Sequence, residues 1–310
     1  MPPFLPFGNT HNVNVIKELS KDRPDLIHFN SYYLWSFPYI ALWSLQKGIP
    51  LICQYHGACD FLRPLRRSFF GIYRSANRYL VPLDDESVYL TKTMGIDPNK
   101  IIKYPNAGVE TTLFRQTSEK ATSPTLLYVG RMPLPSINLR EQSPWLMLMI
   151  LSELVRERKD VKLYMIGDGP GLNYLKELAS KKGLDRNVTF LGYVDHQLLP
   201  EHYSKSWLTF FPTEMDVVDP FWGGAQKESF ACGTPVVAFN DKVSTLEGGK
   251  QAYGYLIPTD SKISAKILSG IIGDRSALNK MGEAGKKTVV NSCSWDSVIS
   301  KLNSIYLSAL

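Results

Sequence analysis

Short apolar runs alternate with longer helical stretches along almost the whole chain. In the first half, the runs lie at 25–30, 50–56, 78–83 and 100–105, and helical stretches fall near 11–20, 32–47, 62–76 and 84–94. In the second half, runs at 125–130, 161–166, 188–191, 208–211 and 236–239 repeat the arrangement. Strands that alternate with helices in this way predict βαβ units and parallel sheets.

A polar stretch at 115–124, which ends in a proline, interrupts the alternation and predicts a linker. The 310 residues are enough for two domains of ordinary size. We therefore expect one Rossmann-like α/β domain at 1–115 and a second at 116–290. We expect the remaining residues, 291–310, to form a helix that packs back toward the first domain.

The last two predicted strands bracket one short helix on which the second domain is centred. The helix is expected to begin after Gly223-Gly224 and to end at Gly233, with a proline two residues later. The free N–H groups of such a helix start can bind an anion, and glycines let a ligand approach the backbone closely. Because the helix follows a parallel strand, its start lies in the crevice where open α/β sheets bind ligands.

Glu228 lies early on this helix and opens the run Glu-Ser-Phe-Ala-Cys-Gly-Thr-Pro-Val-Val-Ala. This run resembles the donor-site signature of retaining GT-B glycosyltransferases (glycosyltransferase family 4, glycosyl transferases group 1). Glu228 matches the second glutamate of that family's paired-glutamate motif. The family's spacing places the first glutamate at Pro220, whereas the nearest acid is Asp219. The motif therefore matches on its C-terminal side and departs from the family on its N-terminal side.

The resemblance implies a GT-B fold, in which two Rossmann-like domains face each other. Family members open with a further strand, a glycine-rich turn and a helix, so we expect the N-terminal domain to lack its first βα unit or units. The implied activity is that of a retaining hexosyltransferase, which moves a hexose from a nucleotide diphosphate sugar to a hydroxyl of a glycan or lipid-linked acceptor. The implied donor is a substrate, and no cofactor is expected.

The resemblance also assigns residues to the diphosphate. Gly130-Arg131 ends the first strand of the second domain, and a guanidinium there matches two phosphate oxygens. Family members carry a lysine six residues later, where this chain has Ile137, so Arg140 is the nearest cation. Arg131 and Arg140 are expected to bind the diphosphate together with the Gly223-Gly224 helix start. An ordinary surface arginine would equally fit position 140.

The resemblance assigns catalytic roles to His56, Asp219 and Glu228. Glu228 would hold ribose or sugar hydroxyls, and Asp219 would take the place of the first glutamate near the sugar. His56 follows a strand, where the family has a His-Gly that contacts the transferred hexose; a histidine that caps a turn would look the same. Tyr193 matches a segment that passes the nucleotide base, with core packing as an equal alternative.

Two other motifs are interpreted as structural. The sequence Gly167-Asp168-Gly169-Pro170 follows a predicted strand, and its glycines suit a tight turn before a helix. The acidic run 84–86 stands at the start of a helix, where capping and the helix dipole account for acids. We predict no metal site, in keeping with the metal-independent diphosphate binding that the resemblance implies.

Composition and charge fit a globular enzyme, with 44% hydrophobic and 21% charged residues. The four cysteines form no C-x₂-C pair, so we expect reduced thiols and a cytoplasmic protein. We find no signal peptide and no apolar run long enough to span a membrane. The net charge of +6 suits nucleotide phosphates or anionic lipid but is too diffuse to indicate nucleic acid.

Segment 61–78 mixes arginines with aromatic residues, which is typical of contact with a membrane surface and also of a half-buried helix with a basic face. An uncovered edge of the shortened N-terminal sheet would call for a second copy of the chain, a partner chain or the Pro-rich N-terminal segment. The alternative function is a degenerate, non-catalytic GT-B chain that binds nucleotide sugar or a partner subunit. The shortened domain, the displaced acid and the missing lysine favour it.

Overall fold

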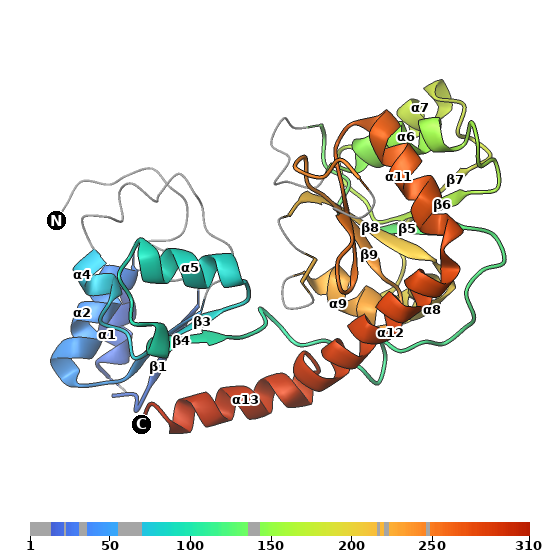
Figure 1. Cartoon of the computed structure of the whole chain (residues 1–310). Coiled ribbons are helices and arrows are strands. Elements are labelled where there is room, and N and C mark those ends of the chain that lie inside the picture. The colour runs from blue at the N-terminus through green and yellow to red at the C-terminus, as the bar shows by residue number, and fades with distance from the viewer. Residues whose placement is uncertain are drawn as a thin grey trace. The chain divides into compact units, whose positions relative to one another are not determined.

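The computed structural model describes residues 14–21, 23–30, 36–54, 70–135, 143–215, 218–219, 223–245 and 249–310. The chain forms two compact units (Figure 1). The first unit comprises the described residues up to Asn106 together with Val298–Leu310, and the second comprises those within Ala107–Ser297. Each unit is built around one parallel sheet.

The first unit has a four-stranded sheet of order β1-β2-β3-β4 in its described part. Its strands are β1 (Ile27–Asn30), β2 (Leu51–Gln54), β3 (Arg78–Val81) and β4 (Ile101–Lys103). Its helices are α1 (Asn14–Leu19), α2 (Phe37–Lys47), α4 (Phe70–Tyr73), α5 (Asp84–Lys92) and the 3₁₀ turn η3 (Pro98–Lys100).

The last helix of the chain, α13 (Trp295–Leu307), completes the core of the first unit. Its residues Val298 and Ile305 are buried in one apolar cluster with Ile52 of β2 and Leu80 of β3. The hydroxyl of Tyr104, just after β4, donates a hydrogen bond of 3.1 Å to the carbonyl of Val298. The C-terminal helix thus shares one hydrophobic core with strands of the N-terminal part of the chain.

The second unit has a six-stranded sheet of order β10-β9-β8-β5-β6-β7. Its strands are β5 (Thr125–Val129), β6 (Lys162–Ile166), β7 (Val188–Gly192), β8 (Leu208–Glu214), β9 (Val236–Phe239) and β10 (Gly254–Ile257). Its helical elements are α6 (Pro144–Leu154), α7 (Leu172–Lys181), η4 (His196–Leu198), α8 (Leu199–Lys205), α9 (Gly224–Ala231), α11 (Ser261–Gly273) and α12 (Arg275–Ser292).

Helices cover both faces of this sheet (Figure 1). Leu126 and Tyr128 of β5 belong to a cluster with residues of α6, α7 and α11, whereas Leu127 belongs to a second cluster with residues of α8, α9 and α12. Successive residues of a strand point to opposite faces, so a strand buried on both sides is apolar throughout. This explains why the strands of this unit were visible in the sequence as continuous apolar runs.

Backbone contacts join the carboxyl ends of β5, β6 and β7. Gly167, with φ of 128°, lies directly against the backbone of Gly130, and a β-carbon on it would overlap the Gly130 carbonyl oxygen. The Gly167 N–H donates to the carbonyl of Gly192 at 2.8 Å, and the Met132 N–H donates to the carbonyl of Asp168 at 2.9 Å. The glycines of the Gly-Asp-Gly-Pro turn therefore serve the packing of these strand ends, as the structural interpretation of that motif expects.

Every apolar run identified in the sequence forms a strand, and the structure adds one more. The additional strand, β10, pairs with β9 at the edge of the second sheet. Its four residues begin with a glycine directly after a bend, so they lack the length and alternation that marked the other strands. At the other sheet, β1 pairs with β2. The covering of the sheet's outer edge by a second copy, a partner chain or the N-terminal segment stays a prediction.

Candidate functional site

The helix α9 begins at the carboxyl end of β8 with Gly224, after Gly223 as its N-cap. The first helical hydrogen bond runs from the Lys227 N–H to the Gly223 carbonyl at 3.1 Å. The N–H groups before Lys227 have no carbonyl within the helix to which they can donate. The N–H of Gly223 donates to the side-chain oxygen of Gln226 at 3.2 Å. Among the described residues, no atom lies within 4 Å of where a β-carbon on Gly224 would be, so they leave the backbone there open to a ligand.

The carboxylate of Glu228, one turn into α9, is held by two side chains. Its Oε1 lies 3.0 Å from Nε2 of His196, and its Oε2 accepts a hydrogen bond of 2.9 Å from the hydroxyl of Tyr203. An ionised carboxylate only accepts, so Nε2 of His196 must carry the hydrogen. Its side chain is 17% exposed, so the carboxylate is oriented from within the protein and still reaches solvent.

Aromatic packing fixes the two side chains that hold Glu228. Tyr203 is fully buried in α8, and burial, followed by the negative charge of Glu228, raises the pKa of its hydroxyl well above the usual value. Phe114 meets the ring of His196 edge-on at 4.8 Å and the ring of Tyr203 at 6.1 Å. The tyrosine hydroxyl therefore stays protonated and remains a hydrogen-bond donor at physiological pH.

A buried cation stands next to Glu228 in the sequence. The side chain of Lys227 is 1% exposed, and burial lowers its pKa to about 8, while the negative charges of Glu228 and Asp219 oppose this shift. Asp219, the acid near the position of the family's first glutamate, is itself buried. Asp219 and Glu228 thus act electrostatically on the same ammonium group.

Two further predicted residues lie at the same edge of the sheet. Arg131 is exposed directly after β5, and its carbonyl accepts a hydrogen bond from the Tyr128 hydroxyl. Tyr193 follows β7 and is 79% exposed, so the alternative that it packs in the core is wrong. His56 and Arg140 lie outside the described residues. The structure therefore gathers Glu228, Asp219, Gly223, Gly224, Arg131 and Tyr193 at the carboxyl ends of the strands of one sheet.

The model of the family described as glycosyl transferases group 1 matches residues 109–288 of this chain. The chain belongs to that family. The model described as Glycosyltransferase Family 4 matches residues 1–113, so the two matches together span residues 1–288. Glu228 lies within the first match.

Curated relatives resemble the chain at low identity. A D-inositol 3-phosphate glycosyltransferase of Segniliparus rotundus is 25% identical over an alignment of 316 positions, gaps included, that covers 93% of this chain and 67% of that protein. A GDP-mannose-dependent alpha-(1-6)-phosphatidylinositol monomannoside mannosyltransferase of Mycobacterium tuberculosis is 30% identical over 155 residues, 48% of this chain. The chain spans only 40% of the length of that relative.

Among solved structures, Anabaena HepE in complex with UDP superposes with a TM-score of 0.71 at 17% identity, covering 96% of this chain and 81% of HepE. Sucrose-phosphate synthase of Thermosynechococcus elongatus gives a TM-score of 0.66 at 21% identity, covering 94% and 75%. At such identities the likeness concerns the fold, which is GT-B as the sequence predicted.

Sequence reasoning missed His196 and Tyr203. They lie 32 and 25 residues before Glu228, and no local motif links them to it. The available signal was weak: they are seven residues apart in one helical stretch, so they share a face with the buried Leu199. A polar residue at each end of a buried helical face is a place to look for such a contact.

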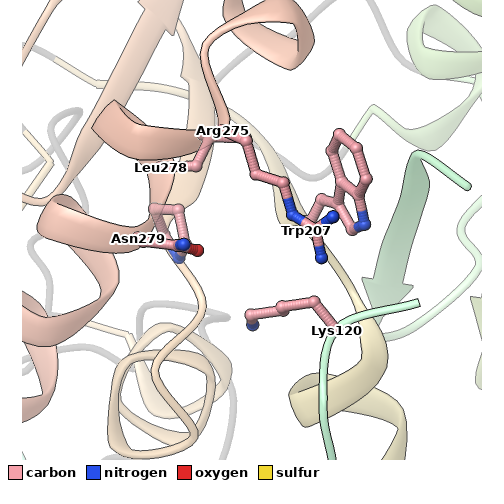
Figure 2. A pocket seen from close by; sticks show the side chains of 6 residues that line it. Lys120, Trp207, Arg275, Leu278 and Asn279 are labelled. Carbon is pink, nitrogen blue, oxygen red and sulfur yellow. The ribbon is translucent and has the colours of Figure 1, made fainter. Parts of the chain in front are cut away.

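The opposite end of the second sheet carries a different polar cluster, shown in Figure 2. A shallow pocket there is lined by Lys120, Trp207, Pro235, Arg275, Leu278 and Asn279. The ammonium of Lys120 donates to the carbonyl of Ser206 at 2.8 Å and to the hydroxyl of Thr234. The guanidinium of Arg275 stacks 4.8 Å from the ring centre of Trp207. We call this group the amino-end cluster, since Trp207 and Pro235 immediately precede β8 and β9.

Two further features concern the described residues. These residues hold no group of three His, Cys, Asp or Glu side chains placed to bind a metal ion. None of the helices among them is both long and apolar enough to cross a membrane. Half of segment 61–78, residues 61–69, lies outside the described residues, and its predicted membrane contact stays a prediction.

Proposed function

We propose that this chain is a retaining glycosyltransferase that moves a hexose from a nucleotide diphosphate sugar to a hydroxyl of a glycan or lipid-linked acceptor. The observation that carries the proposal is the setting of Glu228: an oriented carboxylate one turn after a helix start that is open at Gly224, at the carboxyl end of a parallel strand. Membership in the family and the nucleotide complexes of HepE, which include one with UDP-glucose, support the donor class.

The chemistry follows from the charges at this edge. The α9 N–H groups and the guanidinium of Arg131, joined by Arg140, would bind the diphosphate and stabilise its negative charge as it leaves. Glu228 would accept hydrogen bonds from ribose or sugar hydroxyls. Asp219 would lie near the sugar, and His56 would contact the transferred hexose. The leaving diphosphate would offset the positive charge that develops on the sugar in the transition state.

The test is the variant Glu228→Gln, which keeps the shape and removes the charge. Binding of UDP-glucose, GDP-mannose and ADP-glucose is measured by titration calorimetry, and transfer is measured with labelled sugars. A hydrogen bond to a charged group contributes roughly 1.5–3 kcal/mol, so we expect donor affinity or turnover to fall roughly ten- to over a hundredfold. An unchanged melting curve is the control, and parent-like binding and turnover would remove the proposal's main support.

The same measurements separate the proposal from the alternative of a non-catalytic chain. A chain that only binds donor would give a dissociation constant sensitive to Glu228→Gln but no labelled product with any acceptor extract. A transferase gives product, and the anomeric configuration of that product tests whether the reaction is retaining.

A further inference from the structure

His196 and Tyr203 use only part of what Glu228 can accept. A carboxylate offers about four acceptor positions, two on each oxygen. Tyr203 takes one on Oε2 and His196 takes one on Oε1. About one position therefore remains on each oxygen, which is the number needed to accept hydrogen bonds from two hydroxyls of a ligand.

The two donors differ in how firmly they are held. Tyr203 is fully buried, its hydroxyl is kept protonated by burial and by the charge it faces, and its backbone carbonyl accepts a 2.6 Å hydrogen bond from the Thr234 hydroxyl. His196 lies in η4 with its side chain 59% exposed, and it rests edge-on against Phe114. The first contact comes from the core and the second from the surface.

From this geometry we infer that Tyr203 and His196 are positioning residues that fix the Glu228 carboxylate for donor hydroxyls, an inference that rests on the proposed function. Without them the carboxylate would turn about its side-chain torsions. Holding a binding group in its bound geometry lowers the entropy lost on binding, so the two contacts raise donor affinity without touching the donor. Tyr203 makes the larger contribution because it is buried and held at both its hydroxyl and its backbone.

The first arm of the test removes one hydrogen-bonding atom at a time. Tyr203→Phe keeps the ring against Phe114 and deletes the hydroxyl, while Tyr255→Phe, at a buried tyrosine of the same unit away from the site, is the matched control. We expect Tyr203→Phe to weaken binding of the tightest of UDP-glucose, GDP-mannose and ADP-glucose roughly three- to tenfold, and Tyr255→Phe to leave it unchanged. His196→Ala should weaken it less, and His196→Gln, whose amide N–H can reach the position of Nε2, should restore most of the loss.

The second arm is a double-mutant cycle, which a purely structural role would not satisfy. If Tyr203 acts through Glu228, adding Tyr203→Phe to Glu228→Ala should not weaken donor binding beyond the loss caused by Glu228→Ala alone. Equal losses in both backgrounds would overturn the inference, as would parent-like affinity in both Tyr203→Phe and His196→Ala. Thermal melting of all variants confirms that each is folded.

The outcomes also separate this inference from the proposed function. If Glu228→Gln weakens donor binding but Tyr203→Phe and His196→Ala do not, the inference fails alone. If no nucleotide sugar binds the parent protein, or if Glu228→Gln binds like the parent, the proposed function and the inference fail together.

Discussion

The two ends of the sheet in the second unit both carry cations and hydrogen-bonding side chains, but they use them differently. At the amino end, the ammonium of Lys120 donates to a carbonyl and a hydroxyl, and the guanidinium of Arg275 stacks on Trp207. At the carboxyl end, Arg131 is exposed and Glu228 keeps acceptor positions to spare.

This difference shows how a structural polar cluster is told from a binding site. In the amino-end cluster, a carbonyl, a hydroxyl and an indole ring of the protein already engage the side chains of Lys120 and Arg275, so these cations are committed to contacts within the fold. At the carboxyl end, the protein orients the binding groups but leaves part of their hydrogen-bonding capacity unused. Four predictions test this contrast, in order of falling effect.

The largest effect is expected for Gly167→Ala at the carboxyl end. The positive φ of 128° disfavours alanine, and its β-carbon would overlap the Gly130 carbonyl oxygen. We expect a loss of about 3 kcal/mol or more in the free energy of unfolding, measured by urea denaturation. Gly273→Ala, where a β-carbon meets no atom within 4 Å, is the control and should change stability by less than about 1 kcal/mol.

At the amino end, Lys120→Met should change how stability depends on pH. Burial lowers the pKa of Lys120 to about 8, from the ordinary lysine value of 10.5. A group whose folded pKa is depressed adds stability as pH rises through the window from the folded to the unfolded pKa, because the unfolded chain binds more protons there. The free energy of unfolding of the parent, relative to that of Lys120→Met, should therefore rise by about 2 kcal/mol between about pH 7.5 and 9.5. A constant difference across this range would contradict the assignment.

Arg131→Gln should separate binding from stability. Because the arginine is exposed, we expect the free energy of unfolding to change by less than about 0.5 kcal/mol. If it binds the diphosphate, affinity for the nucleotide sugar should fall roughly tenfold, with a weaker dependence on salt. The matched variant at the amino end is Arg275→Gln, and unchanged donor affinity in Arg131→Gln would remove this residue from the site.

The smallest effect is expected for Arg275→Gln itself. A guanidinium over an indole at an exposed position contributes about 0.5–1 kcal/mol, so stability should fall by that amount. Donor affinity should not change. A loss of donor affinity here would break the contrast between the two ends of the sheet.

Several features of the site could be predicted because they are local. The helix between the last two predicted strands begins at Gly224 and ends at Ala231, and Gly233 adopts the left-handed conformation, with φ of 71°, that its place after the helix suggested. Glu228 therefore had a known position relative to a helix start before any tertiary contact was known. Local spacing is enough to predict such features because a glycine or proline determines the backbone conformation of the turn in which it lies.

Other features could not be predicted, because they depend on which elements become neighbours. Lys227 and Glu228 are adjacent in sequence, yet the first is buried and the second reaches solvent with its carboxylate. Nothing in their local pattern separates them. The strand β10 was missed for the same reason, since only its pairing with β9 makes a four-residue run a strand.

The sequence by itself determined the alternation of strands and helices, the family and the place of Glu228 on its helix, since each depends on periodicity or on the spacing of neighbouring residues. The tertiary structure decided what surrounds that carboxylate. The fold sets α8 against α9, with β5 paired to β8 in the sheet beside them, and this brings Tyr203 and His196 to Glu228 across 25 and 32 residues of sequence. Contacts at that separation follow from the order of strands in the sheet, which no local pattern encodes.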